Sequence, residues 1–493
     1  MKKFLLLMSC FTAIVAQSQQ WVIKRPFEEG VILRGGDCNG IGNYIVGNCN
    51  NVGKSGYTDA YAMYVNNDGE YVEKTFRHEG YRTNLCAAIG LDDGNAFVVG
   101  IKGGTLTDIY HDTLWISVMT PELEIVEEHN YPLIEPYKTW TSDVYLAFNN
   151  YGEIIVLADV SEKDYPMITN GVYAVFKCDT HGNILKSKYF AEGHGVGGAR
   201  PTGIIRVPDS DMMMLLGQGF SYSNYHSICY IDNDLEKVNV YQLPWKESIW
   251  NYTDYWKPNG HFLMSSTTFH QGATSEPQYA AVFEVDDRGR YIDTLVYDRP
   301  DTADYTAQFG SMAYAGNDDI FIATFCQKGV YGQMTADAVI CLIDSDLNLK
   351  GTKRLKDDGT LIRILRCCRT SDGGCLVFGQ CPNIKDRELL CVWKLLPEDF
   401  ILPWTLNDNP EVSPHHEAYP NPTSGYFNVI LDNEESQNVV VSITGEDGCK
   451  YFERRLEARG KLTVDVSSLE NGAYFYEITT KGRSIRKGKF IKY

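Results

Sequence analysis

Residues 44–76 read YIVGNCNNVGKSGYTDAYAMYVNNDGEYVEKTF and contain the pattern that repeats through most of this 493-residue chain. The pattern is a short apolar strand ending in a small residue (YIVG), a second apolar strand (YAMYV), a tight turn (NNDGE) and a third strand (YVEKTF). Asn, Asp and Gly in the turn are the residues that a two-strand reversal requires. The stretch therefore predicts antiparallel strands joined by a tight turn.

The same unit occurs seven times between Gln19 and about Phe400, with a period of roughly 55 residues, in the range of propeller blades. Its first apolar strand recurs as YIVG at Tyr44, AFVVG at Ala96, EIIVLA at Glu153, MMMLLG at Met212, HFLMS at His261, IFIAT at Ile320 and CLVFG at Cys375. A further strand precedes each of these across another tight turn, which gives four strands in each unit. Seven such units without helical periodicity predict an all-β fold, a seven-bladed β-propeller.

The two ends of the repeat region complement each other. The seventh unit ends with LLCVWKLLPEDF at residues 389–400 and has no outermost strand, whereas WVIKRPF at residues 21–27 looks like an outermost strand with no unit before it. We therefore predict that residues 21–27 complete the seventh blade. Such pairing would hide a sheet edge that could otherwise aggregate.

Three motifs near the C-terminus differ from the repeat. They are YPNPTSGYFNV from Tyr419, DVSSLENGAYFYEI from Asp465, and the final RKGKFIKY. Together they resemble the C-terminal sorting domain of the type IX secretion system of Bacteroidetes, over residues 418–493. The motif residues that carry this resemblance are Pro420, Asn421, Pro422, Gly425, Gly472, Tyr474, Lys489 and Lys492.

The resemblance implies partners for this segment. It implies recognition by the type IX secretion machinery and its sortase, cleavage in the linker, and often attachment of the passenger to surface lipopolysaccharide. Anchoring and release both stay open. Apolar runs predict that the segment is a small β-sandwich, with strands near residues 427–431, 439–443, 462–466, 473–479 and 485–491.

The N-terminus has the features of an export signal. Lys2 and Lys3 precede an apolar run, Phe4 to Ala16, that is too short to span a bilayer, and small residues for cleavage follow. No later segment is long and apolar enough to cross a membrane, so we expect a secreted or outer-surface protein that passes through the periplasm. The predicted domains are a signal peptide (1–18), a propeller (19–400), a linker (401–417) and the sorting domain (418–493).

Composition excludes some partners. A formal net charge of −19 argues against nucleic acid or an anionic membrane as partner. No Cys or His pattern has zinc spacing, and we expect neither a metal nor a cofactor. Five late cysteines allow one or two local disulfides in an oxidising compartment, or equally a set of small buried residues. These are Cys367, Cys368, Cys375, Cys381 and Cys391.

One face of the predicted ring carries the long loops. The tight turns all join strand ends on one face, so the loops between second and third strands and the links between blades lie on the other. Function concentrates on long loops held by a rigid scaffold, and aromatic rings with polar tips suit protein interfaces and sugar faces. The candidate ligand-binding residues are Tyr110, Tyr137, Trp140, Tyr222, Tyr225, Trp245, Trp250, Tyr252, Tyr305, Arg82 and Arg200. For each aromatic residue the alternative is bracing its own loop.

The sequence contains no GxSxG, HExxH or phosphate-binding glycine motif, and we predict no catalytic residue. We expect an exported propeller that binds a glycan or a protein through its long-loop face. The alternative is an extracellular hydrolase or lyase that acts on a polymer at the same face, and a purely structural surface protein is a third hypothesis. An enzyme would require loop side chains to converge for acid–base work, drawn from His78, His111, His194, His226, His270, Arg82, Arg200 and Arg299.

Overall fold

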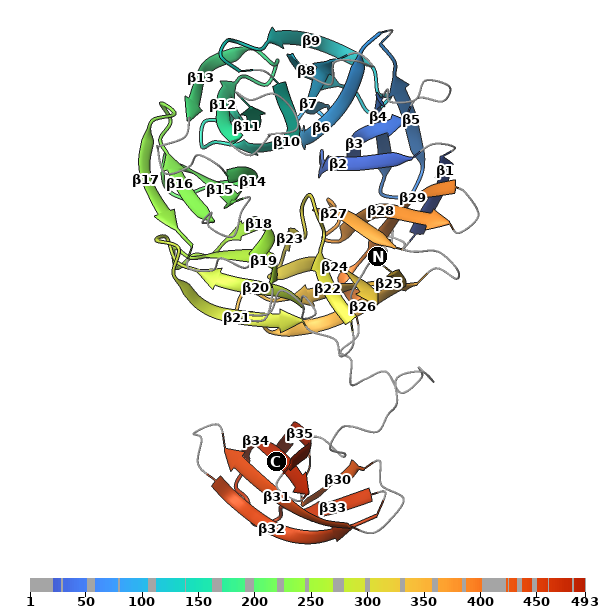
Figure 1. Cartoon of the computed structure of the whole chain (residues 1–493), viewed down its shortest axis with the longest axis vertical. Helices are drawn as coiled ribbons and strands as arrows, with labels where there is room; N and C mark the ends of the chain where they lie inside the picture. The colour runs from blue at the N-terminus through green and yellow to red at the C-terminus, as the bar shows by residue number, and fades with distance from the viewer. Residues whose placement is uncertain are drawn as a thin grey trace, which may run out of the picture. The chain divides into compact units, whose positions relative to one another are not determined.

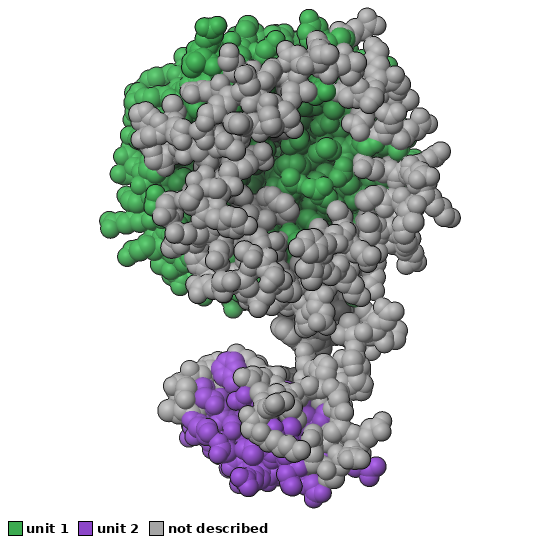
Figure 2. Space-filling model, viewed as in Figure 1, with its two compact units in different colours: residues 1–403 green, residues 404–493 purple. Residues whose placement is uncertain are grey.

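The computed structural model shows an all-β protein. It describes residues 21–492 except 28–29, 51–57, 79, 105–111, 138, 162–170, 191–198, 220–225, 244–247, 269–278, 298–301, 329–332, 357–361, 384–386, 401–422, 424, 432–436, 446–449, 460 and 481–482. Within these residues the elements are strands and one 3-10 turn, η1 (Pro397–Asp399), which confirms the all-β prediction. The chain divides into two compact units, Met1–Pro403 (unit 1) and Trp404–Tyr493 (unit 2), coloured in Figure 2. The predicted signal peptide and the whole of the predicted linker lie outside the described residues.

Unit 1 consists of consecutive antiparallel sheets, which we number in chain order (Figure 1). Sheet 1 contains β2 (Val31–Cys38), β3 (Gly42–Asn50), β4 (Thr58–Asn66) and β5 (Tyr71–Phe76). Sheet 2 contains β6 (Arg82–Gly90), β7 (Ala96–Gly103), β8 (Thr113–Met119) and β9 (Ile125–Pro132). Sheet 3 contains β10 (Thr139–Phe148), β11 (Ile154–Ser161), β12 (Gly171–Cys178) and β13 (Ile184–Phe190).

The later sheets of unit 1 follow the same order with two exceptions. Sheet 4 contains β14 (Ala199–Arg206), β15 (Met213–Gly219), β16 (Ser227–Ile231) and β17 (Lys237–Gln242), and sheet 5 contains β18 (Ser248–Trp256), β19 (Phe262–Thr268), β20 (Tyr279–Val285) and β21 (Tyr291–Tyr297). In sheet 6 the first strand is split into β22 (Thr302–Thr306) and β23 (Met312–Gly316), which both pair with β24 (Asp319–Lys328), followed by β25 (Gln333–Ile343) and β26 (Leu349–Lys356). Sheet 7 contains β27 (Arg363–Arg369), β28 (Cys375–Asn383), β29 (Arg387–Leu395) and, from the other end of unit 1, β1 (Trp21–Phe27).

The first strands of successive sheets are neighbours around a common centre (Figure 1). In order these neighbours are β2, β6, β10, β14, β18, β23 and β27, and β27 in turn lies beside β2. Second strands are covered on both sides, so every residue of β11 is buried, whereas the outermost strand β9 alternates between half-buried and exposed positions. This gradient explains why the inner strands are continuous apolar runs in the sequence.

In several turns between third and fourth strands, one side-chain oxygen accepts two backbone hydrogen bonds from within the turn. The side-chain oxygen Oδ1 of Asp232 accepts hydrogen bonds from the backbone N–H groups of Asp234 (2.9 Å) and Glu236 (2.8 Å). Asp286 and Asp344 make the same pair of bonds in sheets 5 and 6. Acceptors of this kind stabilise the reversed chain locally. The Asp and Asn pattern seen in the sequence is therefore the cause of these turns.

The predicted pairing of the N-terminal segment with the seventh sheet is confirmed. All seven residues of β1 pair antiparallel with β29, from Trp21 opposite Lys394 to Phe27 opposite Glu388. Trp21 Nε1 donates to the backbone oxygen of Asn67 at 2.8 Å, and Lys394 Nζ donates to the same oxygen at 3.2 Å. Because Asn67 lies in the last turn of sheet 1, these two bonds join sheet 7 to sheet 1.

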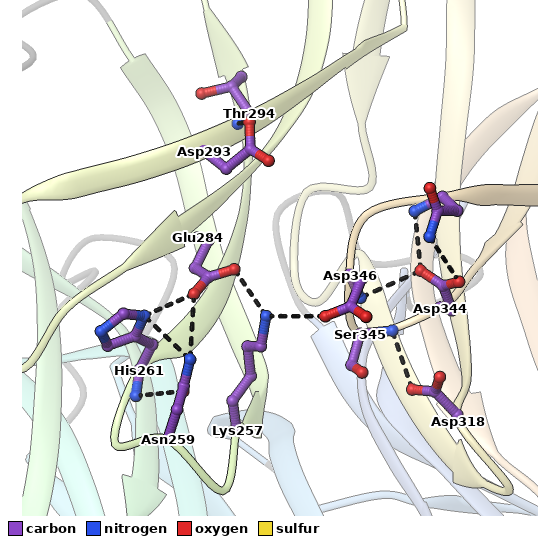
Figure 3. Close-up of polar contacts among 11 residues, drawn as sticks. Lys257, Asn259, His261, Glu284, Asp293, Thr294, Asp318, Asp344, Ser345 and Asp346 are labelled. Carbon is purple, nitrogen blue, oxygen red and sulfur yellow. Dashed lines mark hydrogen bonds and ion pairs between the residues drawn. The ribbon is translucent and has the colours of Figure 1, made fainter. Parts of the chain in front are cut away.

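A buried ion pair lies between sheets 5 and 6 (Figure 3). Lys257 Nζ contacts a carboxylate oxygen of Glu284 at 2.6 Å, and both side chains are about nine-tenths buried. The other carboxylate oxygen of Glu284 receives His261 Nδ1 and the amide of Asn259, the latter at 3.3 Å. Lys257 Nζ also reaches Asp346 of the neighbouring sheet at 3.5 Å. Burial acts to raise the pKa of Glu284, but its bonds to Lys257 and His261 hold it below the ordinary value.

The twelve cysteines in the described part of the chain form no disulfide with one another. Cys367, Cys375, Cys381 and Cys391 pack in one apolar cluster between sheets 6 and 7, and Cys368 packs in the next. Of the two alternatives for these late cysteines, the structure therefore has the small buried residues.

Unit 2 is a small β-structure of two sheets around one apolar core. One sheet pairs β30 (Tyr426–Ile430) with β33 (Lys461–Asp465), and the other has the order β32 (Lys450–Ala458), β31 (Gln437–Gly445), β34 (Gly472–Thr480) and β35 (Arg483–Lys492). The five predicted strands are present. The sixth, β32, was not predicted because its sequence KYFERRLEA is charged and largely exposed.

Candidate functional site

Every first strand of unit 1 is irregular part-way along its length. In six sheets the register with the second strand shifts there, and in sheet 6 the first strand is interrupted between β22 and β23. The shifts lie between Leu33 and Gly35, Leu85 and Ala87, Trp140 and Val144, Pro201 and Gly203, Ile249 and Tyr252, Tyr252 and Tyr255, and Ile364 and Arg366. Bulges bend a strand and re-aim its side chains, and they are frequent beside functional sites.

The irregular positions surround a small pocket of about 30 Å³ at the centre of unit 1. Six first strands contribute to its lining, and we call it the axial pocket. Small and aliphatic residues form much of the wall, while Tyr145, Tyr252 and Arg366 supply polar groups. The complete lining is Gly35, Ala87, Ala88, Val144, Tyr145, Leu146, Ile204, Tyr252 and Arg366. A concave site with a few convergent polar groups is the usual form of a ligand pocket.

Two guanidinium groups meet at Phe309, in the interruption of the sixth sheet. Arg366 Nη1 donates to the backbone oxygen of Phe309 at 2.6 Å, and the carbon Cζ of Arg34 lies 4.8 Å from the centre of the Phe309 ring. Arg366 also lies over Tyr252, with Cζ 5.6 Å from the ring centre and Nη2 3.4 Å from the hydroxyl. Among the described residues, the buried Nε atoms of Arg34 and Arg366 have no hydrogen-bond partner.

The two tyrosines of the axial pocket stay protonated at neutral pH. Burial raises the pKa of the Tyr145 phenol and of the Tyr252 phenol well above the ordinary value, and the nearby Arg366 only partly opposes this. A neutral phenol both donates and accepts a hydrogen bond. The pocket therefore offers a cationic donor, Arg366, and two neutral hydroxyls, which come from three different first strands.

Acidic side chains occupy the C-terminal ends of the same strands. Asp37 lies 3.9 Å from Arg369, and its other oxygen accepts the backbone N–H of Gly90 at 3.2 Å. Asp254 accepts the backbone N–H of Tyr314 at 3.1 Å. The Asp254 side chain is exposed, but the surrounding protein limits the solvation of its carboxylate and raises its pKa to about 6, against the opposing effects of the Tyr314 N–H and of Arg369.

Asp254→Asn is expected to change how stability depends on pH. A carboxyl whose pKa is higher in the folded protein than the ordinary value near 3.9 favours folding when protonated and loses this contribution as pH rises through about 6. The groups that face Asp254 are Arg366, Arg369, Asp37 and the N–H of Tyr314. We expect the variant to gain melting temperature at pH 7.5 and not at pH 4, measured by calorimetry. Asp92→Asn, in the tight turn between β6 and β7, is the control, and identical pH profiles for Asp254→Asn and the native chain would contradict the assignment.

The structure places some predicted ligand-binding residues within the core. Trp140 is buried and packs with Phe176, with the ring centres 5.9 Å apart. Tyr137 stacks on Tyr189 at 4.8 Å, and Tyr305 stacks on Phe325 at 5.4 Å. These three rings therefore pack against other aromatic side chains of unit 1.

Tyr252 is the predicted residue that lines the axial pocket. Arg82 begins β6, and its buried Nε has no partner among the described residues. Trp250 and Arg200 belong to β18 and β14, but their side chains lie outside the described part. Tyr110, Tyr222, Tyr225 and Trp245 lie outside the described residues altogether.

The loop histidines fall only partly within the described residues. His111, His194 and His270 lie outside the described residues, and so does Arg299. His226 is buried at the start of the third strand of sheet 4. His78 packs edge-on against Trp115, and burial lowers its pKa. Among the residues that the structure describes, no group of three or more His, Cys, Asp or Glu side chains is placed to hold a metal ion.

Sequence reasoning missed the residues at the centre. Arg34, Tyr145 and Arg366 lie in LRGGD, SDVYLAF and RILRCCR, which are first strands flanked by apolar residues. The available signal was a charged residue inside a strand that is otherwise buried, since such residues are rarely buried without a role or a partner.

Comparison with known proteins identifies the C-terminal part. Residues 417–492 match the family model described as the secretion system C-terminal sorting domain. Unit 2 contains a secretion sorting domain. The sorting domain implies export to the cell surface or secretion through the type IX machinery. No helix in the described residues has the length and apolar character needed to cross a membrane.

Other comparisons are weak. A search of curated proteins found no match. Among solved structures, a Synechocystis apocarotenoid oxygenase variant is 10% identical with a TM-score of 0.41, over 77% of this chain and 94% of that one. A cobalt-substituted form of the Synechocystis enzyme is 10% identical with a TM-score of 0.38, and a chimera described as ACO/RPE65 is 11% identical with a TM-score of 0.37; each covers 77% of this chain and 94% of its own. These scores are too low to carry an inference.

The motif residues of the sorting domain lie on several of its strands. Gly472 begins β34 opposite Lys492 of β35, and Lys489 pairs opposite Phe475. Tyr474 is buried and stacks on Phe490, with ring centres 5.5 Å apart. Lys492 is also buried and forms a bridge with Thr423. The backbone oxygen of Gly425 accepts the N–H of Val466 at 2.8 Å, while Pro420, Asn421 and Pro422 lie outside the described residues.

Proposed function

We propose that unit 1 is a seven-bladed β-propeller delivered by the sorting domain, and that it binds a macromolecular ligand through its long-loop face. The sequential order of first strands around one centre and the pairing of β1 with β29 support the propeller architecture. The single observation that carries the binding function is the axial pocket, where six first strands converge and polar side chains face an open space. In this proposal the ligand spans the long loops and inserts one group into the pocket.

Binding accounts for the chemistry of the axial pocket. Tyr145 and Tyr252 each combine an aromatic ring with a hydroxyl, and such residues contribute strongly to recognition because they are rigid and amphipathic. The bulges orient these side chains from strands whose other residues form the core. A rigid scaffold with a preformed pocket loses little conformational entropy when the ligand binds.

An extracellular hydrolase or lyase is the second candidate function. The observation that favours it is Asp254, whose pKa of about 6 suits proton transfer near neutral pH. Arg366 acts on the same carboxyl through its charge. Product formation from a polymer, lost in Asp254→Asn, would support this function over simple binding.

An array of glycans and proteins, probed with the chain lacking residues 1–18, tests the proposed function. We expect a ligand whose affinity falls about tenfold or more in Tyr252→Ala, because the ring and hydroxyl are both removed from the pocket. Tyr151→Ala is the matched control, since Tyr151 is an exposed residue of a tight turn. Circular dichroism checks that both variants fold. Equal loss in the two variants, or none in Tyr252→Ala, would overturn binding at the axial pocket.

A further inference from the structure

We propose that the axial pocket binds the carboxylate of an acidic sugar residue, with two cationic groups: Arg366 in the pocket lining, and Arg34, which meets Arg366 at Phe309. This inference rests on the proposed binding function and adds the chemical class of the ligand. It follows from three features of the pocket: unpaired guanidinium groups, acceptors for hydroxyls, and aromatic rings.

The first feature is an excess of unused hydrogen-bond donors. A guanidinium group has five N–H donors and no acceptor, and it stays charged in proteins. Arg366 uses Nη1 on the Phe309 backbone oxygen and Nη2 weakly on Tyr252, which leaves Nε buried and unpartnered within the described residues. A buried donor without a partner is costly, and an incoming oxyanion would satisfy it.

Arg34 adds a second positive charge at Phe309. Its guanidinium lies over the Phe309 ring, and its Nε is also buried without a partner among the described residues. The described part of the chain shows no ion pair for Arg34 or Arg366, whereas Arg369 faces Asp37. Asp254 acts on Arg366 through its charge, but no ion pair between them is seen in the described residues. In a chain with a net charge of −19, the two arginines therefore form a local site for an anion.

The second and third features favour a sugar over a peptide carboxylate. The phenol oxygens of Tyr145 and Tyr252 in the pocket lining accept hydrogen bonds, as ring hydroxyls require, and Asp254 follows Tyr252 two positions later on β18. The rings of the two tyrosines provide flat apolar surface with polar edges, which matches the face of a sugar ring. The adjoining wall of the pocket consists of the small residues Ala87 and Ala88.

The test uses the chain lacking residues 1–18 and isothermal titration calorimetry. The probes are a uronic-acid tetrasaccharide, the neutral tetrasaccharide of the same linkage, N-acetylalanine as a peptide-type carboxylate, and sodium sulfate. We expect the acidic tetrasaccharide to bind about tenfold or more tighter than the neutral one. Hydrogen bonds between a guanidinium group and a carboxylate are stronger than hydrogen bonds between neutral groups. Arg366→Gln and Arg34→Gln should each remove most of this preference, and Arg366→Lys should retain part of it.

Arg288→Gln, at an exposed turn of sheet 5, is the matched control and should leave the preference unchanged. If Arg366→Gln does not fold, Arg34→Gln and Arg366→Lys carry the test. Equal affinity for acidic and neutral tetrasaccharides, or a preference that survives both Gln variants, overturns the inference. Tighter binding of N-acetylalanine or sulfate than of the uronic acid overturns the sugar assignment.

The outcomes separate this inference from the proposed function. An array ligand that depends on Tyr252 but shows no preference for acidic sugars would leave the binding function standing and overturn only the carboxylate site. The opposite outcome is that uronic-acid binding depends on the arginines while the array ligand binds equally well in Tyr252→Ala. That result would support the carboxylate site and overturn the proposed binding of a macromolecule at the axial pocket.

Discussion

Deleting residues 19–27 is expected to abolish cooperative folding of unit 1. The deletion removes β1, which pairs with β29 along its whole length, and exposes the backbone edge of β29. It also removes the Trp21–Asn67 bond, the ion pair of Arg25 with Glu73 at 2.8 Å, and the edge-on contact of Phe27 with Tyr61 at 5.3 Å. An unpaired strand edge invites association between chains. We expect loss of a sharp thermal transition by calorimetry and concentration-dependent aggregation by light scattering.

Trp21→Phe is the matched control for this deletion. It keeps the strand and most of the aromatic surface but removes the indole N–H that donates to Asn67. The expected cost is about 1 kcal/mol, the usual net contribution of one hydrogen bond. A deleted chain that melts as sharply and at the same temperature as the native chain would show that β1 does not complete the fold.

Glu284→Gln is expected to lower the free energy of unfolding by about 3–5 kcal/mol, as for other buried pairs that lose one partner. The substitution leaves the Lys257 ammonium buried, with its other carboxylate contact, Asp346, at the longer distance of 3.5 Å. Denaturant unfolding followed by fluorescence measures the change. Asp346→Asn is the matched control, because Asp346 is mostly exposed and such pairs contribute about 0–1 kcal/mol.

Two further results test this account of the pair. The double variant Lys257→Met with Glu284→Leu should recover most of the loss, since apolar replacement of a buried ion pair is often neutral. The pH dependence has a defined sign: Glu284 has a lowered pKa in the folded protein, so its contribution is present above pH 4.5 and is lost as pH falls further. A small effect of Glu284→Gln, equal to that of Asp346→Asn, would contradict the importance of the pair.

The local chemistry of unit 1 could be read from the sequence because turns and apolar runs act over short distances. The Asp and Asn acceptors at Asn66, Asp232 and Asp286 make side-chain bonds within four residues of themselves. The pairing of β1 was predictable because one repeat lacked a strand that the N-terminus supplied. These inferences require no knowledge of contacts between distant residues.

The axial pocket could not be predicted in the same way. Arg34 and Arg366 are more than 300 positions apart, and they meet at Phe309 only because the first strands are neighbours. The interruption between β22 and β23 also depends on another sheet: the N–H of Phe309 bonds to Leu365, and the oxygen of Gly310 accepts the N–H of Cys367. The segment therefore pairs with β27 in place of its own sheet, which its sequence alone does not reveal.

The shared acceptor at Asn67 has a consequence for the order in which the chain can fold. Trp21 reaches this oxygen from 46 positions away, but Lys394 reaches it from 327 positions away, and Gln380 contacts the Val31 oxygen across 349 positions. Closing such long segments is entropically costly and slows folding. Strand β1 therefore has no pairing partner until β29 is available. A chain that crosses a membrane from its N-terminus onward reaches its final topology only when β29 has crossed. A chain that stops before this point would display the open edge of an incomplete sheet.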